Sequence, residues 1–247
     1  MSPGVQSLTR SFEMKYFVPE LAPEDEFPAQ SVLEDKFGGL PWGLPSERWP
    51  LCVSCGSPQC LLAQLHHHRE RLDLGKGGRV LLVFACNDDF SRCPTWDMNS
   101  GANSCFVVDA EELGEGLTSP QVSHGFTQRR MDRWLDEQVH PAWRLVRWRE
   151  EDDGIPESYP GFFGLMHGLP DGYDEKEYQS HWSQVPQETK LGSVPFWIQF
   201  PVIPPGGRFL GQIDSNCCQA FGDNGIGYIF LSGPAAAPRG WFLWQCT

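Results

Sequence analysis

The chain lacks any long hydrophobic run, and no stretch comes near the length of about 18 apolar residues that a membrane-spanning helix needs. Its first residues, MSPGVQSLTRSFEMKYF, also have no apolar core of signal-peptide length. These absences predict a cytoplasmic protein that does not bind membranes. In that reducing compartment the nine cysteines would be thiols, buried small side chains or metal ligands, and not a disulfide framework.

Basic residues are scarce. The chain has 19 Lys and Arg against 32 Asp and Glu, which gives a formal net charge of −13. Such a charge repels nucleic-acid phosphate, so direct binding of DNA or RNA is not expected. The charge would suit a basic protein partner, although an acidic surface that only keeps the protein in solution has the same composition.

The familiar catalytic motifs are missing as well. The sequence holds no nucleophile elbow, no phosphate-binding loop, no paired-glycine fingerprint and no H-E-x-x-H motif. The glycine-rich GDNGIG at 222–227 leads into an apolar segment and is typical of a turn. A protein that is not an enzyme is therefore favoured, and the question of catalysis stays open.

Glycine, proline and aromatic residues are, in contrast, abundant. The 26 glycines and 21 prolines favour many short elements joined by defined turns. One segment, TQRRMDRWLDEQVHPAWRLV at 127–146, spaces its apolar residues as a helix does and contains Pro141 near its end. We therefore expect an α+β fold that is predominantly β.

The chain contains an internal repeat. Residues 61–85 align without gaps on residues 209–233, with apolar residues on apolar residues. Upstream, KFGGLPW at 36–42 matches KLGSVPF at 190–196, with Lys, Gly and Pro retained. The upstream motifs lie 154 residues apart, whereas the longer segments lie 148 residues apart. The first copy therefore has 154 − 148 = 6 extra residues, which lie in the segment containing CVSCG. The pattern predicts two copies of a β unit that bury together what neither would bury alone.

The repeat suggests a domain organisation. We expect an N-terminal segment, 1–30, followed by a single domain, 31–247. Its two repeats would span about 31–150, including the cysteine insertion, and about 185–247, with the predicted helix between the copies.

Four of the cysteines have the spacing of a metal site. Cys52 and Cys55 form a C-x2-C knuckle followed by Gly56, and glycine lets backbone N–H groups turn toward thiolate sulfur. Cys86 and Cys93 follow the predicted strand that pairs with the one after the knuckle, so a hairpin would bring both loops to one sheet edge. Four thiolates there would close a tetrahedral, structural zinc site. The alternative is a set of buried or free thiols.

Gln64 and Gln212 occupy matching positions at the ends of apolar strands. An amide there can bond both backbone donors and backbone acceptors of the neighbouring copy, and it has no pKa that would serve a general base. We expect a structural role for both residues. Binding of a ligand by the two amides in a shared cleft is the alternative.

The segment between the repeats combines acidic and aromatic residues. Acidic stretches at 150–153 and 171–177 flank an aromatic-rich segment at 159–173. Aromatic anchors with a charged rim are typical of a partner interface, whereas aromatics that merely close the core would need no partner. The candidate binding residues here are Asp152, Asp153, Phe162, Phe163 and Tyr173.

Several motifs resemble those of the YwqG-like family of bacterial domains of unknown function: KFGGLPW, WPLCVSCGSP, LLAQL, GRVLLVFAC, CPTWDMNSGAN, KLGSVPFWIQ, RFLGQIDS and FGDNGIGYIFL. The resemblance covers roughly 36–247 and implies a largely β fold with internal duplication and no established catalytic residues. The first half is similar, more distantly, to the cysteine-bearing N-terminal part of programmed-cell-death-2-like proteins, which act as chaperones for a ribosomal protein. Relatives encoded near secreted polymorphic toxins imply immunity or another protein-binding role, and simpler members lack the cysteine segment.

Together these features predict a cytoplasmic protein-binding module with a structural zinc site. Its most specific form is an immunity protein that neutralises a basic toxin. Two alternatives stay open: a chaperone-like escort of a basic ribosomal protein, and a small-ligand-binding protein or enzyme that uses the cleft between the repeats.

Overall fold

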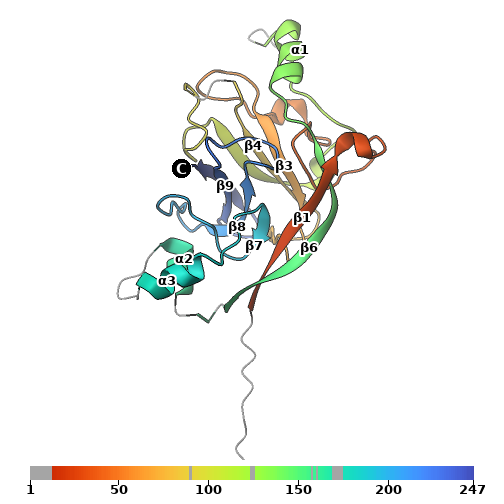
Figure 1. Ribbon diagram of the computed structural model, residues 1–247. Helices are drawn as coiled ribbons and strands as arrows, with labels where there is room; N and C mark the ends of the chain where they lie inside the picture. Colours follow the sequence, from red (N-terminus) through yellow and green to blue (C-terminus); the bar gives the residue numbers. More distant parts are fainter. Residues whose placement is uncertain (1–12, 89–90, 123–125, 157, 160, 169–174) are drawn as a thin grey trace, which may run out of the picture.

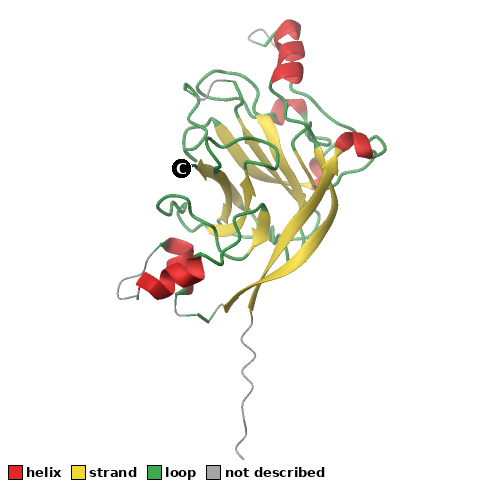
Figure 2. Cartoon of the chain, viewed as in Figure 1, coloured by secondary structure: helices red, strands yellow, loops and turns green. Residues whose placement is uncertain are grey.

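The computed structural model describes residues 13–247, except 89–90, 123–125, 157, 160 and 169–174. Within them, ten strands form one antiparallel sheet that curls around a central core, and the few helices lie outside it (Figures 1 and 2). The expectation of an α+β fold that is predominantly β is confirmed. No helix in this described part of the chain is long and apolar enough to cross a membrane.

The elements have the following bounds. The strands are β1 (Glu13–Pro23), β2 (Lys36–Phe37), β3 (Cys60–His66), β4 (Arg79–Ala85), β5 (Asn103–Asp109), β6 (Trp143–Pro156), β7 (Lys190–Gly192), β8 (Arg208–Asp214), β9 (Ile226–Ser232) and β10 (Arg239–Gln245). The α-helices are α1 (Gln128–Glu137), α2 (Phe162–His167) and α3 (Glu175–Trp182), and the short 3-10 turns are η1 (Glu24–Glu26), η2 (Ser46–Arg48) and η3 (Ala110–Glu112).

The strand order is β10-β9-β8-β7-β1-β6-β2-β3-β4-β5. This order is symmetric about its centre. Each of the strands β1 to β5 stands as far from one edge of the sheet as its counterpart among β6 to β10 stands from the other edge. The long strands β1 and β6 pair with each other at the centre (Figure 1), and each of them also pairs with a strand of the other half of the chain: β1 with β7, and β6 with β2.

The sequence led us to expect an N-terminal segment, 1–30, that is separate from the domain. The described part of this segment belongs to the domain instead. Residues 13–23 form the central strand β1. Its two prolines, Pro19 and Pro23, argue against a central strand when the sequence is read alone, because proline cannot donate to a ladder. The structure accommodates Pro19 because β7 pairs with β1 only at Tyr16 and Phe17, which leaves the rest of that side of β1 without a ladder to β7.

The predicted helix is present as α1, but it ends at Glu137, and residues 143–156 continue as β6. The acidic stretch 150–153 lies inside this strand. Part of its charge is paired there, since Glu150 contacts Lys15 across the β1–β6 ladder and Glu151 contacts Arg149.

The registers of the two halves match at the strands nearest the centre. Lys36 lies opposite Gln64 in the β2–β3 pair, and Lys190 lies opposite Gln212 in the β7–β8 pair. The β3–β4 and β8–β9 ladders each contain an irregularity, and it falls at matching positions. These positions are Leu61/Ala63 and Phe209/Gly211.

The gapless alignment is wrong in the second strand of each unit. Gln64 lies opposite Leu82, which is 18 residues further along, whereas Gln212 lies opposite Tyr228, only 16 residues further along. Leu82 therefore corresponds to Tyr228 and not to Phe230. The physical reason is the length of chain between paired positions: 13 residues separate His66 from its partner Val80, whereas 11 separate Asp214 from its partner Ile226.

A shared core fills the space between the two halves of the sheet. Leu62 and Leu81 of the first half and Ile229 of the second belong to this one cluster. The outer faces carry separate clusters, which pack around Trp134 of α1 on the first half and around Trp197 on the second. Because both faces of the sheet are covered, β4 and β9 have almost continuous apolar sequences instead of an alternating pattern.

Candidate functional site

Cys52, Cys55, Cys86 and Cys93 come together at one edge of the sheet. Their four sulfur atoms all lie within 4.8 Å of one another, and the Cys55 and Cys86 Sγ atoms are 3.6 Å apart. Strands β3 and β4 are antiparallel, so the loop that enters β3 meets the loop that leaves β4. The expected clustering of these four cysteines is confirmed.

The spacing fits a tetrahedral metal site. Zinc–sulfur bonds of about 2.3 Å place tetrahedral ligand sulfurs about 3.8 Å apart, whereas a disulfide would need about 2 Å. All four cysteines are free thiols, and Cys52, Cys86 and Cys93 are buried while Cys55 is half-buried. The four residues fit a closed site in which the protein supplies every ligand, which is the form of a structural metal site.

The cysteine knuckle is itself a tight turn. Gly56 has a φ of 74°, and its N–H donates to the Cys52 carbonyl at 2.8 Å. The Cys52 N–H donates to the Ser57 carbonyl at 2.9 Å, and the Ser57 N–H points at the Cys55 Sγ atom at 3.5 Å. The turn thus aims backbone donors at sulfur, which favours the thiolate that a metal requires.

The thiols of the cluster differ in acidity. Burial by itself would raise the pKa of Cys52, but backbone N–H groups of the knuckle and the neighbouring Cys55 and Cys86 thiols outweigh it and hold that pKa below its ordinary value. Burial raises the pKa of Cys86, and it raises the pKa of Cys93 to about 12. A bound divalent cation would supply the charge that stabilises all four thiolates together.

Gln64 is enclosed in the first half. Its Oε1 atom accepts the Trp42 N–H at 2.8 Å, and its Nε2 atom donates to the Glu34 carbonyl at 2.9 Å. The side chain therefore ties the chain before β2 and the chain after it to strand β3.

Gln212 makes the same bonds in the second half. Its Oε1 atom accepts the Phe196 N–H at 2.9 Å, and its Nε2 atom donates to the carbonyls of Pro186 and Glu188, each at 3.1 Å. Phe196 and Glu188 lie 154 residues after Trp42 and Glu34, which is the offset of the matching β2 and β7 segments.

The two glutamines thus have structural partners, with one correction. The expected partners were backbone groups of the neighbouring copy, but each amide bonds only its own half of the chain. Both side chains are buried and bond backbone groups through both amide atoms, which favours the structural role.

We predict that Gln212→Ala will lower the free energy of unfolding by about 2–3 kcal/mol, because it leaves a buried N–H and two carbonyls without a partner. Urea denaturation measures this loss. The control is Gln199→Ala, which removes an exposed amide and should change stability by less than about 0.5 kcal/mol. Equal effects of the two substitutions would contradict the structural role of Gln212.

The proposed acidic rim needs a correction at Asp153. This side chain is only 7% exposed; it accepts the Ile155 N–H at 2.9 Å and contacts the Ser193 hydroxyl. It holds β6 to the loop after β7, so it cannot meet a partner directly. Asp152, the next residue, is exposed.

The candidate aromatic anchors also differ in burial. Phe162 is partly buried against a small cluster that includes Leu165 and Val185, so it helps to close the core. Phe163 is 70% exposed and is available to a partner. Tyr173 lies outside the described residues.

Two buried lysines went unnoticed in the sequence. Lys36 and Lys190 are fully buried at matching positions opposite the two glutamines. Burial lowers the pKa of Lys36 to about 8 and that of Lys190 to about 7. Lys is the first residue of both matching motifs, which indicates that the two lysines are equivalent. The motifs do not indicate that either lysine is buried.

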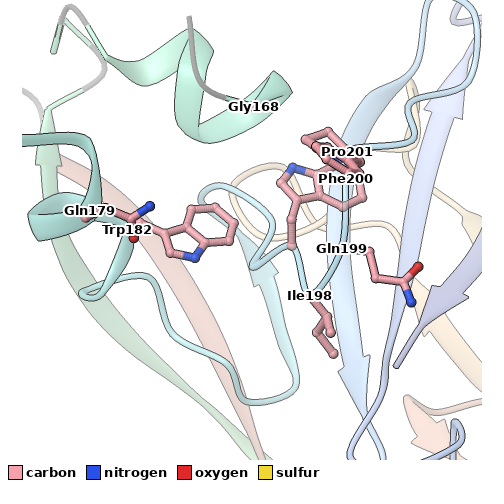
Figure 3. A pocket seen from close by; sticks show the side chains of 8 residues that line it. Gly168, Gln179, Trp182, Ile198, Gln199, Phe200 and Pro201 are labelled. Carbon is pink, nitrogen blue, oxygen red and sulfur yellow. The ribbon is translucent and has the colours of Figure 1, made fainter. Parts of the chain in front are cut away.

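A cleft of about 610 Å³ was also unexpected. It lies between α3 and the segment 197–201, next to Gly168 at the end of α2 (Figure 3). Its walls carry aromatic side chains, among them Trp182 and Phe200. Because these two residues are distant in sequence and sit on unrelated elements, no local pattern links them.

The comparisons with known proteins add no name to these observations. A scan against protein-family models finds no match to the chain, and a search of curated proteins finds no similar sequence.

Proposed function

We propose that this chain is a protein-binding module whose fold is stabilised by a structural zinc ion. The observation that carries the zinc assignment is the closed cluster of Cys52, Cys55, Cys86 and Cys93, with no ligand position left for water. Such a site serves stability and not catalysis. Elemental analysis of protein purified without chelator should find about one zinc per chain.

We also propose that the two halves of the chain are copies of one β unit and that the chain is a member of the YwqG-like family. The symmetric strand order, the paired Lys–Gln registers and the matching irregularities support a duplication. Related sequences, once aligned, should keep Lys36 with Lys190 and Gln64 with Gln212. Relatives that retain these residues in one half only would contradict the duplication.

The partner we propose is a basic protein. The formal net charge of −13 favours association with positive charge, and an exposed aromatic residue such as Phe163 is of the kind that anchors an interface. The resemblance implies an immunity protein that neutralises a basic toxin, so the first partners to test are the products of genes that flank its own. Co-expression followed by size-exclusion chromatography tests this directly, and failure of every flanking product to bind would remove the immunity role.

A chaperone-like escort of a basic ribosomal protein is the second candidate. Its support is the similarity of the cysteine-bearing first half, whose knuckle residues the structure brings together. Binding to a purified basic ribosomal protein, with no binding to flanking gene products, would favour this role over immunity.

If the partner is basic, Asp152→Lys should slow its association by about two- to fivefold at low salt, because exposed charges mainly affect the association rate. Stopped-flow kinetics at several salt concentrations measures the effect, which should shrink as salt rises. The matched control is Glu111→Lys in η3, which changes the net charge equally but lies next to β5, away from β6 in the sheet. Equal slowing by both variants would show that only net charge matters.

A further inference from the structure

The cleft beside α3 is built by a segment that only the second half possesses. Residues 157–189 connect β6 to β7 and carry α2 and α3, whereas the matching connection from β1 to β2, residues 24–35, is much shorter. An insertion into one copy of a repeated unit often carries a binding function, because the remaining framework does not need it.

The walls of the cleft are held in place. Trp182 of α3 stacks on Phe196, with ring centroids 5.1 Å apart and an interplanar angle of 18°. On the opposite side, the segment 199–200 is fixed by Gln245, whose amide accepts the Gln199 N–H at 3.0 Å and donates to the Phe200 carbonyl at 2.8 Å. Figure 3 shows Trp182 on one side of an open space and Phe200 and Pro201 on the other.

Phe200 is 91% exposed, although its backbone is held firmly. Together with Trp182, which lines the same cleft, this exposed ring forms an apolar surface of the kind that ligand-binding grooves expose. Pro201 adds a second ring to the same wall. The arrangement offers a slot for a flat or ring-shaped apolar group between Trp182 and these two residues.

The lining also limits the chemistry of the ligand. No charged side chain is among the described residues that line the cleft, so these residues favour an uncharged group over a phosphate, a carboxylate or an ammonium group. Its polar side chains are the amides of Gln179 and Gln199, and Gln199 already donates to the Cys246 carbonyl at 2.8 Å.

We propose that this cleft binds an extended, proline-rich segment of a protein partner, with basic residues on either side of the prolines. Proline rings match a slot between aromatic walls, and a polyproline II segment is already ordered, so little entropy is lost on binding. Its backbone carbonyls are free to accept a hydrogen bond from the exposed Gln179 amide. The basic flanks follow from the formal net charge of −13, which attracts positive charge to the surface around the cleft. This inference deepens the protein-binding role and rests on it.

The test is a titration of the full chain with a synthetic peptide of consecutive prolines that has an arginine at each end. The control peptide replaces the prolines with glycine and serine and keeps both arginines. Tryptophan fluorescence reports on binding, and the indole N–H signals in a ¹⁵N NMR spectrum locate it. We expect saturable binding of the proline peptide and at least about tenfold weaker binding of the control, a difference of about 1.4 kcal/mol.

Variants place the binding in the cleft. Phe200→Ser should weaken the proline peptide by about tenfold, as loss of an aromatic anchor does, and Phe200→Trp should restore it. The exposed ring of Phe200 makes both variants compatible with folding. Val32→Ser is the control, since Val32 is an exposed apolar residue that does not line the cleft and has no role in the proposed interface.

Three results would overturn the proposal: no binding of the proline peptide, equal binding of both peptides, or equal weakening by Phe200→Ser and Val32→Ser. A co-expressed partner distinguishes these outcomes from failure of the protein-binding role. If Phe200→Ser forms the complex with a co-expressed partner as well as the unaltered chain does, the cleft is not used and the module still binds. If no partner binds the unaltered chain, the wider role itself fails.

Discussion

Cys55→Ser will abolish stoichiometric zinc binding and lower the free energy of unfolding by about 4 kcal/mol, because loss of a structural metal is among the most destabilising single changes. For a chain of this length the melting temperature should fall by about 10 °C. The effect should be this large because the cluster joins the loop before β3 to the loop after β4, and both strands contribute to the shared core. Elemental analysis and thermal unfolding followed by circular dichroism measure the two quantities.

The matched control is Cys246→Ser, which alters a half-buried thiol outside the cluster. This variant should keep its zinc and lose less than about 1 kcal/mol of stability. A chelator should reproduce the effect of Cys55→Ser in the unaltered protein and have no effect on the variant. If Cys55→Ser keeps both its metal and its stability, the cluster is only a group of thiols.

Lys190→Met will stabilise the protein at neutral pH by about 2 kcal/mol, because a well-packed apolar side chain replaces a buried amine that is costly to charge. Lys190 is fully buried, and its Nζ atom has no hydrogen-bond partner among the described residues. Burial lowers its pKa to about 7, although the charges of Asp153 and Glu188 act in the opposite direction. Chemical denaturation at a series of pH values measures the gain.

The pH dependence has a definite sign. The pKa of Lys190 is about 7 in the folded protein, against an ordinary value of 10.5. Between these values the unfolded chain binds the proton that the folded chain lacks, so the contribution of Lys190 to stability rises with pH. The cost of burial is complete below about pH 7 and disappears above the unfolded pKa. The advantage of Lys190→Met should therefore be largest at or below pH 7 and shrink toward pH 10.

Lys36→Met is the matched comparison, because Lys36 occupies the corresponding position in the first half. Its Nζ atom donates to Gln30 Oε1 at 2.8 Å, and its pKa is lowered only to about 8. The gain from Lys36→Met should be smaller, constant below about pH 8, and should fall only between about pH 8 and the unfolded pKa of 10.5. If Lys190→Met destabilises the protein at pH 7, or leaves the pH dependence unchanged, the buried amine is better accommodated than its surroundings indicate.

Local sequence was sufficient for four of the strands and for the cysteine cluster. Strands β3, β4, β8 and β9 were visible because sheet faces that are buried on both sides produce continuous apolar runs between turn residues. The cysteine cluster followed from the same feature, since a single hairpin brings its two loops together and all four ligands flank that hairpin.

Tertiary structure decided how the halves are joined. The exchange of β1 and β6 between the halves depends on pairing between segments more than a hundred residues apart, and no local periodicity encodes such a choice. The burial of Asp153, which removed it from the proposed acidic surface, follows from the same pairing, because it brings β6 to the Ser193 loop. The two-residue difference in register between the two halves was hidden as well, because apolar strands tolerate a shift in alignment while the ladder does not.

The sequence by itself thus determined the elements whose partners lie nearby along the chain: the paired strands, helix α1 and the four-cysteine cluster. Only the tertiary structure decided which strands stand at the centre, which charges are buried and which aromatic rings remain uncovered. The physical reason is that periodicity records whether a face is buried but not what buries it. The environment of Lys190 and the wall formed by Phe200 are set by side chains from distant segments, whose contributions appear only when the sheet closes around its core.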